Sequence, residues 1–279
     1  MSIRVAVDIG GTFTDFVSLD EETGTIIEEK AHTTPENFAV GVIDAVKKSG
    51  ISLSEVSYFV HGTTVVINAV TERKGAKTAL ITTKGFRDVL EIGRANRPDM
   101  YNYFYKKPEP FVPRYLRFEV DERMNYKGEV LKEAKEAEIV EIAGKLKTEE
   151  VQAVAVCFIN SYANPEHERL VGRILERELP GVEVTLSCNL LKEWREYERT
   201  STTVLNAYVK PAARKYLDTL RDELMRMGLT EEPHAMQSNG GTATFARAKE
   251  VPISLIESGP VGGVIGANEL GKIIGEKNI

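Results

Sequence analysis

The opening thirty residues constrain the fold more than any other feature of the sequence. Three short runs of strand character follow one another there, at residues 3–9, 13–19 and 25–30. A Glu-Glu-Thr-Gly turn at residues 21–24 separates the last two runs. Strands so close in sequence must pair as antiparallel hairpins, because a parallel return needs a crossover of about a dozen residues or more. We therefore expect the chain to begin with an antiparallel meander.

Strand and helix patterns alternate beyond this meander. Further strands are expected at residues 56–60, 77–82, 151–158, 182–186 and 234–237. Helices are expected at residues 36–49, 65–73, 133–147, 165–179, 197–227 and 260–274. Thr34 is a candidate N-terminal cap of the helix expected at residues 36–49, and Gly50 is expected to end that helix. Pro211 should kink or divide the long helix expected at residues 197–227. Residues 93–128 have no clean period and indicate an excursion from the core. The pattern predicts an α/β fold in which helices flank a mixed sheet.

The composition excludes some classes of function. A net charge of -6, with 28% charged residues, argues against non-specific electrostatic binding to nucleic acid. A small phosphate ligand is still compatible, because a few backbone N–H groups can bind one without net positive charge. The sequence has neither the long apolar run of a membrane helix nor the apolar stretch of a signal peptide at its N-terminus. We therefore expect a cytoplasmic protein that contacts no membrane.

The cysteines and histidines point to no metal or disulfide framework. Cys157 and Cys188 lie far apart and form no Cys-x-x-Cys pattern. His32, His167 and His234 have no partners at metal-ligand spacing. We assign these side chains no functional role.

The strongest local motif is Asp8-Ile-Gly-Gly-Thr-Phe-Thr-Asp15, in the connection between the first two strands. Its two glycines let the backbone adopt left-handed conformations and approach a phosphate within hydrogen-bonding distance. Thr12 and Thr14 add hydroxyl donors. Asp8 is placed to hold Mg²⁺ through water, or to orient an attacking group. The alternative is a plain Gly-Gly hairpin with side-chain turns.

Two further glycine turns follow predicted strands. His61-Gly-Thr-Thr64 opens a helix, so its N–H groups could meet an anion or a polarised substrate oxygen. A helix cap, with His61 hydrogen-bonded by the backbone, is an equal alternative. The second turn is Ser238-Asn-Gly-Gly241. Tyr-Glu-Arg at residues 197–199 is either part of a site or a charged patch on a helix. The polar cluster of Arg94, Asn96, Arg97 and Asp99 either contacts a partner or substrate or forms a solvated loop.

These features resemble the actin-like ATPase fold of the ribonuclease H-like type, shared by sugar kinases, Hsp70 chaperones and acetate kinase. In that fold two duplicated lobes, each with an Asp-x-Gly-Gly-Thr hairpin loop, close on ATP from opposite sides. Along its length the chain more closely resembles the hydantoinase A/5-oxoprolinase family, whose lineage includes ATP-dependent acetone and acetophenone carboxylases. The blocks that carry this resemblance are residues 5–16, 61–64, 68–75, 85–88, 91–94, 97–98, 160–166, 195–208, 237–241 and 258–267.

The resemblance implies two sequence regions and a missing lobe. Residues 1–180 correspond to the N-terminal-like region with the phosphate loop, and residues 181–279 to the start of the hydantoinase A-like region. Residues 257–267 resemble the helix that crosses between lobes, with small residues that permit close packing. In the family a second Asp-x-Gly-Gly-Thr loop follows within a few residues, whereas this sequence ends at Ile279. We therefore expect one lobe, with the second lobe missing.

The resemblance also implies an activity. A hydrolase of this family uses ATP to phosphorylate the amide oxygen of a cyclic imide or lactam, which makes the carbonyl carbon electrophilic. A hydantoinase B-like partner subunit then completes ring opening with water. Two alternatives remain open: an ATP-dependent carboxylase (ligase) of the acetone or acetophenone type, and an isolated lobe without turnover.

Residue roles follow from the motifs and the resemblance. The ATP cradle is assigned to Gly10, Gly11, Thr12 and Thr14. Substrate contacts are assigned to His61, Gly62, Thr63 and Thr64. Asp8 is the expected Mg²⁺ ligand and, with Asp15, a catalytic carboxylate. Asn239 stands at about the place where sugar kinases carry an aspartate that takes a proton from the accepting hydroxyl. Its amide cannot act as a base, but a substrate with a nucleophilic amide oxygen would not need one.

Overall fold

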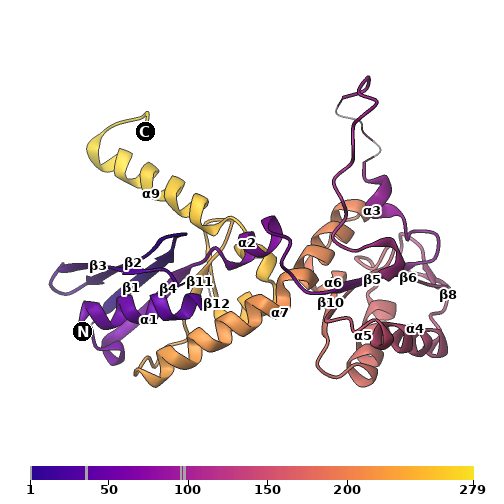
Figure 1. Cartoon of the computed structure of the whole chain (residues 1–279), viewed down its shortest axis with the longest axis horizontal. Coiled ribbons are helices and arrows are strands. Elements are labelled where there is room, and N and C mark those ends of the chain that lie inside the picture. Colours follow the sequence, from indigo (N-terminus) through magenta and orange to yellow (C-terminus); the bar gives the residue numbers. More distant parts are fainter. Residues whose placement is uncertain (1, 35–36, 95, 97–98) are drawn as a thin grey trace. The chain divides into compact units, whose positions relative to one another are not determined.

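The opening meander forms as the sequence predicts (Figure 1). β1 (Ile3–Ile9) and β2 (Phe13–Asp20) pair antiparallel, and β2 pairs in the same way with β3 (Ile26–His32). The structure is a computed structural model that describes residues 2–34, 37–94, 96 and 99–279.

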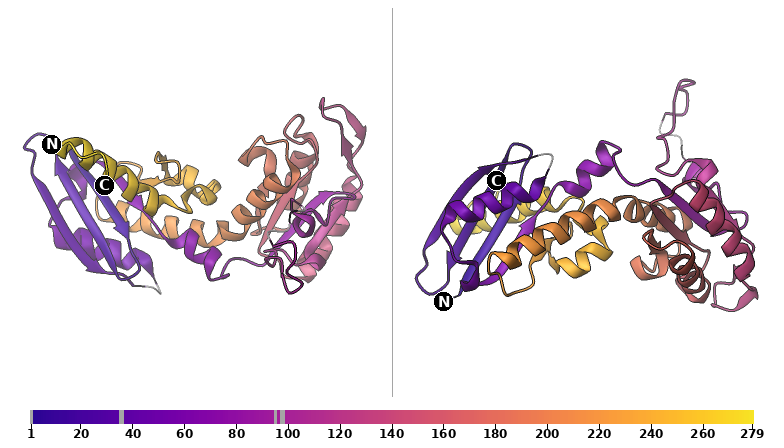
Figure 2. Two further views of the ribbon diagram at one scale, coloured as in Figure 1. Left: turned by 90° about the horizontal axis from the view of Figure 1, so that it is seen from above. Right: turned by 60° about the horizontal axis from the view of Figure 1, so that its bottom comes forward.

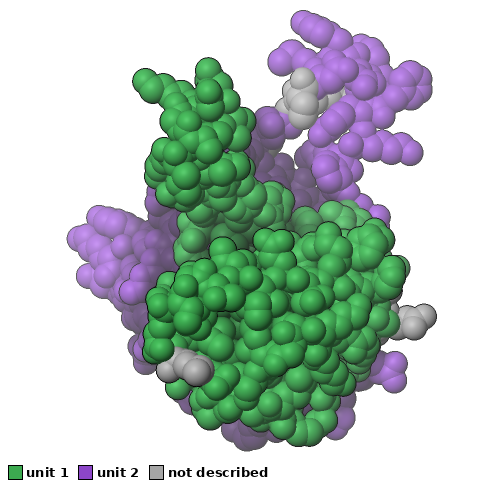
Figure 3. Space-filling model, turned by 90° about the vertical axis from the view of Figure 1, so that its left-hand side faces the viewer, with its two compact units in different colours: residues 1–74, 212–279 green, residues 75–211 purple. Residues whose placement is uncertain are grey.

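The chain divides into two compact units, which Figure 3 colours separately. Unit 1 combines residues 1–74 with residues 212–279, and unit 2 consists of residues 75–211. Unit 2 is therefore an insertion in the chain of unit 1. The division expected between residues 180 and 181 separates two sequence regions. It coincides with neither boundary of the compact units, which lie after residues 74 and 211.

Unit 1 is built on a six-stranded mixed sheet with the order β12-β11-β4-β1-β2-β3. β4 (Val56–Gly62) lies parallel to β1, and β11 (His234–Met236) lies parallel to β4. β12 (Thr242–Thr244) pairs antiparallel with β11. The carboxyl ends of β1, β4 and β11 therefore meet at one edge of the sheet. The expected mixed sheet of an actin-like lobe is confirmed, and this edge positions the candidate site.

The two faces of this sheet have different surroundings. Buried and exposed residues alternate along β1 and β2, as packing on one side requires. The buried face includes Val7 and Phe16 and packs against α1 (Phe38–Ser49). The second half of α7 (Glu196–Arg226) covers the same face, because Tyr216 contacts the rings of both Phe38 and His61.

α1 has a polar cap at its start and a glycine at its end. The side chain of Asn37 accepts a hydrogen bond from the backbone N–H of Ala39, so the cap is Asn37 rather than Thr34. Residue 36, the expected first residue of this helix, lies outside the described residues. Gly50 ends the helix as predicted, in the left-handed conformation at φ 69°.

α9 (Ser258–Ile274) lies on the opposite side of the sheet from α1 (Figures 1 and 2). Its Gly262 packs on β11, because a Cβ atom at Gly262 would lie 3.1 Å from the Sδ atom of Met236. Much of this side remains exposed, including Val17 and Ile26 of the sheet and Ile273 of α9. An exposed apolar area of this kind is typical of a contact surface.

Unit 2 contains a four-stranded parallel sheet of its own, with the order β10-β9-β5-β6. Its strands are β5 (Thr78–Thr83), β6 (Arg117–Val120), β9 (Ala153–Cys157) and β10 (Glu183–Leu186). Every residue of β5 and β9 is buried, as expected for parallel strands covered on both faces. α4 (Glu136–Thr148) and α5 (Glu166–Glu178) contribute apolar residues to this core.

Shorter elements complete the two units. In unit 1 they are η1 (Leu53–Glu55), α2 (Val65–Thr71), α8 (Phe245–Glu250) and η3 (Pro252–Leu255). In unit 2 they are α3 (Val89–Ile92), η2 (Arg114–Leu116), β7 (Arg123–Met124), β8 (Val130–Lys132) and α6 (Ser187–Leu190). Among the residues that the structure describes, no helix has the length and apolar character needed to cross a membrane.

Two expectations about the chain between these elements need correction. Residues 93–128 are not wholly an excursion, because they include β6, which is paired with β5 in the core sheet of unit 2. Of the two outcomes expected at Pro211, a kink or a division, the division is not seen: α7 continues through the proline, although the proline lacks one backbone donor. The boundary between the two units falls at this proline instead.

Candidate active site at the carboxyl edge of the unit 1 sheet

Four polar or glycine positions form a row across this edge of the sheet. Asp8 of β1 is opposite Asp15 of β2 on one side and Gly62 of β4 on the other. Asp15 is in turn opposite Lys30 of β3, and their side chains form an ion pair of 2.9 Å. Because cross-strand neighbours project from the same face, both carboxylates lie on the face that α1 leaves uncovered. The structure therefore brings the two predicted catalytic carboxylates together.

The Asp8 carboxyl group is crowded at this position. A Cβ atom at Gly62 would lie 2.3 Å from Oδ1 of Asp8, so only glycine leaves room for this carboxylate. Partial burial of the carboxyl group, and secondarily the negative charge of Asp15, raise the pKa of Asp8 above its usual range. A cation bound beside these two carboxylates would relieve that cost.

The loop of Gly10, Gly11 and Thr12 turns the chain from β1 into β2. The backbone N–H of Gly10 donates to the carbonyl of Phe13 at 2.9 Å. Neither glycine has a left-handed backbone, so the left-handed conformations expected of the diglycine are not formed. Space explains Gly10, because a Cβ atom there would lie 3.1 Å from the carbonyl oxygen of Phe13. The position beside Gly11 is open, so a side chain there would meet no other part of the protein.

The loop has donors available to a ligand. Among the described residues, the backbone N–H groups of Gly11 and Thr12 donate to no protein acceptor. Both residues are exposed, and no atom lies within 4 Å of the place that a Gly11 Cβ atom would take. Adjacent N–H groups with open space in front of them suit a phosphate oxygen.

Thr14 supports the loop from behind. Its side chain is fully buried, and its hydroxyl lies 3.2 Å from the hydroxyl of Thr33. Thr33 donates from its hydroxyl to the carbonyl of Gly10 and from its backbone N–H to the carbonyl of Thr12. The structure thus places Thr14 on the core side of β2, whereas Thr12 is on the solvent side.

The side chains of His61 and Thr63 also lie on the core side of the sheet. His61 is fully buried, with Nδ1 3.1 Å from the carbonyl oxygen of Val7 and Nε2 2.7 Å from the hydroxyl of Tyr216. Burial lowers the pKa of His61 to about 4, so its ring is neutral at pH 7. Thr63 is buried as well, and its carbonyl accepts from Ser258 at the start of α9. Gly62 and Thr64 are partly exposed at the sheet edge.

Asn239 lies in the exposed turn between β11 and β12. Its side-chain oxygen accepts from the backbone N–H of Gly241 at 2.9 Å, and Gly240 has a left-handed backbone at φ 84°. Ser238 holds the turn in place through two hydrogen bonds. Its hydroxyl donates to the carbonyl of Ser254 and accepts from the backbone N–H of Glu257, the residue before α9. The turn therefore follows β11 at the same edge as the Asp8 row.

The donor types at this edge fit a magnesium–phosphate group. Two carboxylates and two available backbone N–H groups lie on adjoining residues of one hairpin. In the described part of the chain, no three His, Cys, Asp or Glu side chains are placed to hold a metal alone. Mg²⁺ does not require such a set, because one or two carboxylates and the phosphates of a substrate commonly share its coordination.

Sequence reasoning missed the residues that hold the site in place. Tyr216 is on α7, far along the chain from His61, and no sequence motif links the two. Thr33 follows β3 and gave no signal of its own. The inward direction of Thr14 was predictable, because alternation along β2 puts it on the same face as Phe16.

The other polar residues considered in the sequence lie in unit 2. Arg199 is fully buried, and its guanidinium donates to the carbonyl of Phe158 at 2.6 Å. Glu198 pairs with Arg94 at 2.7 Å. Arg97 lies outside the described residues.

Comparison with known proteins identifies the family. The family model of the hydantoinase/oxoprolinase N-terminal region matches residues 4–179, and that of hydantoinase/oxoprolinase matches residues 199–279. The chain belongs to the hydantoinase/oxoprolinase family.

Several hydantoinase/oxoprolinase relatives match nearly the whole chain. An uncharacterized protein of Methanocaldococcus jannaschii is 39% identical over 282 residues, which are 100% of this chain and 42% of the relative. The caprolactamase subunit alpha of Pseudomonas jessenii is 33% identical over 92% of this chain and 38% of its own. The acetone carboxylase beta subunit of Xanthobacter autotrophicus is 32% identical over 99% of this chain and 41% of its own.

Solved structures of two such enzymes share the fold. A nucleotide-free structure of acetone carboxylase, whose reaction is ATP-dependent, superposes with a TM-score of 0.88 and 31% identity over 98% of this chain. The ATP-dependent caprolactamase of Pseudomonas jessenii superposes with a TM-score of 0.82 and 32% identity over 96% of this chain. This chain spans 41% of the length of each of those chains.

Proposed function

We propose that the chain carries the first phosphate-binding lobe of an ATP-dependent hydrolase of the hydantoinase/oxoprolinase type. The substrate is a cyclic imide or lactam whose amide oxygen accepts the γ-phosphoryl group. The observation that supports this most is the hairpin edge, where available N–H groups of Gly11 and Thr12 adjoin the crowded carboxylates of Asp8 and Asp15. Membership of the family and the ATP dependence of the matched enzymes support the same proposal.

ATP would supply the phosphoryl group, and Mg²⁺ would neutralise the charge that develops on it. The N–H groups of Gly11 and Thr12 bind phosphate oxygens, and the open space beside Gly11 lets the backbone approach them. Asp8, which is paired across the strands with Asp15, would hold the cation, and Asp15 could add a second carboxylate. Gly10 and Thr14 keep the loop in shape rather than touching the ligand.

The remaining predicted residues position the substrate. Gly62 and Thr64 border the edge beside Asp8, while His61 and Thr63 hold that turn from the core side. Asn239 offers an amide on the neighbouring turn, which can hydrogen-bond to a carbonyl or N–H of the substrate but cannot remove a proton. An amide oxygen is already nucleophilic, so its attack on the γ-phosphorus of ATP, with ADP as the leaving group, needs no base.

A carboxylase is the second candidate, and the high TM-score to acetone carboxylase favours it. In that case the same lobe would activate bicarbonate or a ketone as a phosphoryl ester. The two candidates differ in the acceptor that stimulates ADP release: a lactam for the hydrolase, or a ketone with bicarbonate for the ligase.

The complete enzyme needs further parts in either case. The named relatives are subunits, which supports a hydantoinase B-like partner that completes ring opening with water. A second lobe with its own Asp-x-Gly-Gly-Thr loop would close the nucleotide site. We propose that the chain comprises two sequence regions. Residues 1–180 contain the phosphate loop, and residues 181–279 form the start of the hydantoinase A-like region.

Calorimetric titration with ATP and Mg²⁺ tests the proposal. The chain is measured alone and then together with a chain that carries the second lobe. Binding that needs the second lobe supports a divided site, whereas tight binding to the single chain would show that the site is complete within residues 1–279. If ATP and Mg²⁺ bind neither to the chain alone nor to the chain with the second lobe, the lobe has no nucleotide function.

A matched pair of glycine variants separates binding from folding. Gly11→Ala adds a methyl group in open space, so it should leave the fold unchanged and weaken ATP binding by about tenfold or more. Gly144→Ala in α4 also adds a methyl group in open space and should not affect binding. Equal affinities of the two variants would remove the loop from the nucleotide site.

A further inference from the structure

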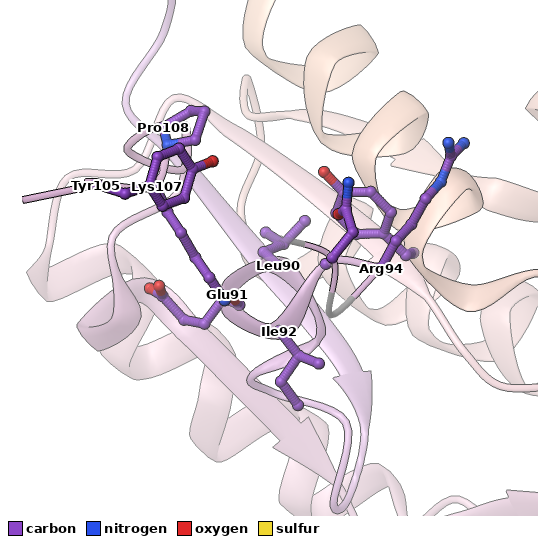
Figure 4. Close-up of a pocket in the computed structure, with 10 residues that line it drawn as sticks. Leu90, Glu91, Ile92, Arg94, Tyr105, Lys107 and Pro108 are labelled. Atoms are coloured by element: carbon purple, nitrogen blue, oxygen red, sulfur yellow. Dashed lines mark hydrogen bonds between the residues drawn. The ribbon is translucent and has the colours of Figure 1, made fainter. Parts of the chain in front are cut away.

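Unit 2 contains a pocket that the proposed nucleotide lobe does not use (Figure 4). Its volume is about 400 Å³, which suits a small organic molecule. It is formed by α3 and the residues after it, by the segment at residues 105–108, and by Tyr197 at the start of α7.

The pocket lies where parallel α/β sheets commonly bind ligands. α3 follows the carboxyl end of β5, and Tyr197 closely precedes Arg199, which bonds to the carbonyl of Phe158 directly after β9. The chain runs from β5 to β6 on one side and then returns to β9 on the other side. The order of the strands therefore reverses between β5 and β9, and crevices outside such a reversal are the usual ligand sites of these sheets.

The lining of the pocket combines apolar and aromatic side chains with charged and polar ones. Leu90, Ile92 and Pro108 contribute apolar surface, and Ile92 is 58% exposed although it is a large aliphatic residue. Tyr105 and Tyr197 add aromatic surface. Figure 4 shows Lys107 and Tyr105 on one side of the pocket and Arg94 on the other, with Leu90 and Ile92 between them.

The charges around the pocket leave one cation unbalanced. Arg94 pairs with Glu198 at 2.7 Å, and Glu91 pairs with Arg117 at 2.9 Å. The ammonium group of Lys107 donates to the carbonyl oxygen of Glu91 at 2.9 Å, which neutralises no charge. Among the described residues, no carboxylate lies within ion-pair distance of Lys107. A single uncompensated positive charge suits a monoanion better than a nucleotide or another multiply charged phosphate.

We propose that this pocket binds a small monocarboxylic acid with a flat or aliphatic body. Lys107 holds the carboxylate, and the tyrosines with the apolar residues of α3 enclose the body of the ligand. The pocket is lined by residues of unit 2 alone, whereas the phosphate loop belongs to unit 1, so we expect ligand binding here without ATP.

The test uses phenylacetate and its neutral, nearly isosteric amide, phenylacetamide, as probes of the full chain by NMR titration. Phenylacetate should bind saturably, shift the resonances of residues 90–94, 105–108 and 197, and bind about tenfold more tightly than phenylacetamide. Lys107→Met should reduce the affinity for phenylacetate to that for the amide, whereas Lys106→Met, which alters the neighbouring exposed lysine, should not.

Three results would overturn the proposal. They are the absence of saturable shifts at these residues, equal affinities for acid and amide in the unchanged chain, and equal effects of the two lysine substitutions. The comparison of acid with amide needs no variant, so the proposal can be tested even if Lys107→Met unfolds.

Discussion

The Nε2 atom of His61 lies 2.7 Å from the hydroxyl oxygen of Tyr216, although 155 residues separate them in the chain. The other ring nitrogen, Nδ1, faces the carbonyl oxygen of Val7, which can only accept. Nδ1 therefore carries the proton, and Nε2 accepts from the hydroxyl of Tyr216. This buried chain of hydrogen bonds fixes the end of β4, beside Asp8, to α7.

Removal of the Tyr216 hydroxyl should destabilise unit 1. Tyr216→Phe leaves Nε2 of His61 buried without a donor, at an expected cost of about 1–3 kcal/mol in the free energy of unfolding. Tyr58→Phe is the control, because the Tyr58 hydroxyl bonds to Thr242 in an exposed pair. Urea unfolding of both variants gives the comparison, and equal stabilities would show that the buried bond contributes nothing.

The stability of the chain should fall in mildly acidic solution. The unfolded chain binds a proton on His61 below pH 6.5, whereas the folded chain does so only below about pH 4. The free energy of unfolding should therefore decrease as the pH falls through this window, by about 3 kcal/mol in total. His61→Gln should flatten this pH dependence, and His32→Gln, at an exposed position, should retain it. Unfolding curves between pH 4 and pH 7 that are parallel for both variants would contradict the assignment.

Asp8→Asn should separate function from stability. The raised pKa of Asp8 means that the folded chain keeps this proton to higher pH than the unfolded chain. The ionised carboxylate therefore opposes folding as the pH rises above 3.8 and through the folded pKa. The variant should keep or raise Tm while ATP–Mg²⁺ binding is lost. Asp44→Asn on α1 is the control for both measurements, and a variant that binds ATP–Mg²⁺ normally would exclude Asp8 from the cation site.

Glu168 should be essential to the fold of unit 2. It is fully buried and accepts from the N–H of Phe158, the hydroxyl of Ser187 and the N–H of Cys188, at 2.7 to 2.8 Å. Glu168→Gln turns an amide N–H₂ toward at least one of these donors, so we expect a loss of about 2–3 kcal/mol. Glu176→Gln, at an exposed position of the same helix, should have little effect in chemical unfolding. A stable Glu168 variant would show that these donors find other acceptors.

Local elements were predictable because they depend on local patterns. The apolar, β-branched character of residues 3–9 predicted β1 with its observed bounds, and Gly50 predicted the end of α1. The second sheet was not predictable, because a buried run such as β5 does not reveal which sheet it will join. The same limit applies to the site: Asp8 and the loop were evident from a motif, whereas Tyr216 reaches the site only through the packing of α7.

The insertion of unit 2 also determines the order in which the protein can acquire structure. Residues 75–211 form one continuous stretch, so unit 2 can fold from contacts within itself as soon as that stretch leaves the ribosome. The pairing of β4 with β11, by contrast, must wait for residues beyond the insertion, because Val60 pairs with His234 across the whole of it. Pairing over such a distance has a large loop-closure entropy and folds slowly from an unstructured chain. A folded unit 2 shortens the flexible part of that loop, so the nascent insertion acts as an intramolecular aid to closing the sheet that carries Asp8.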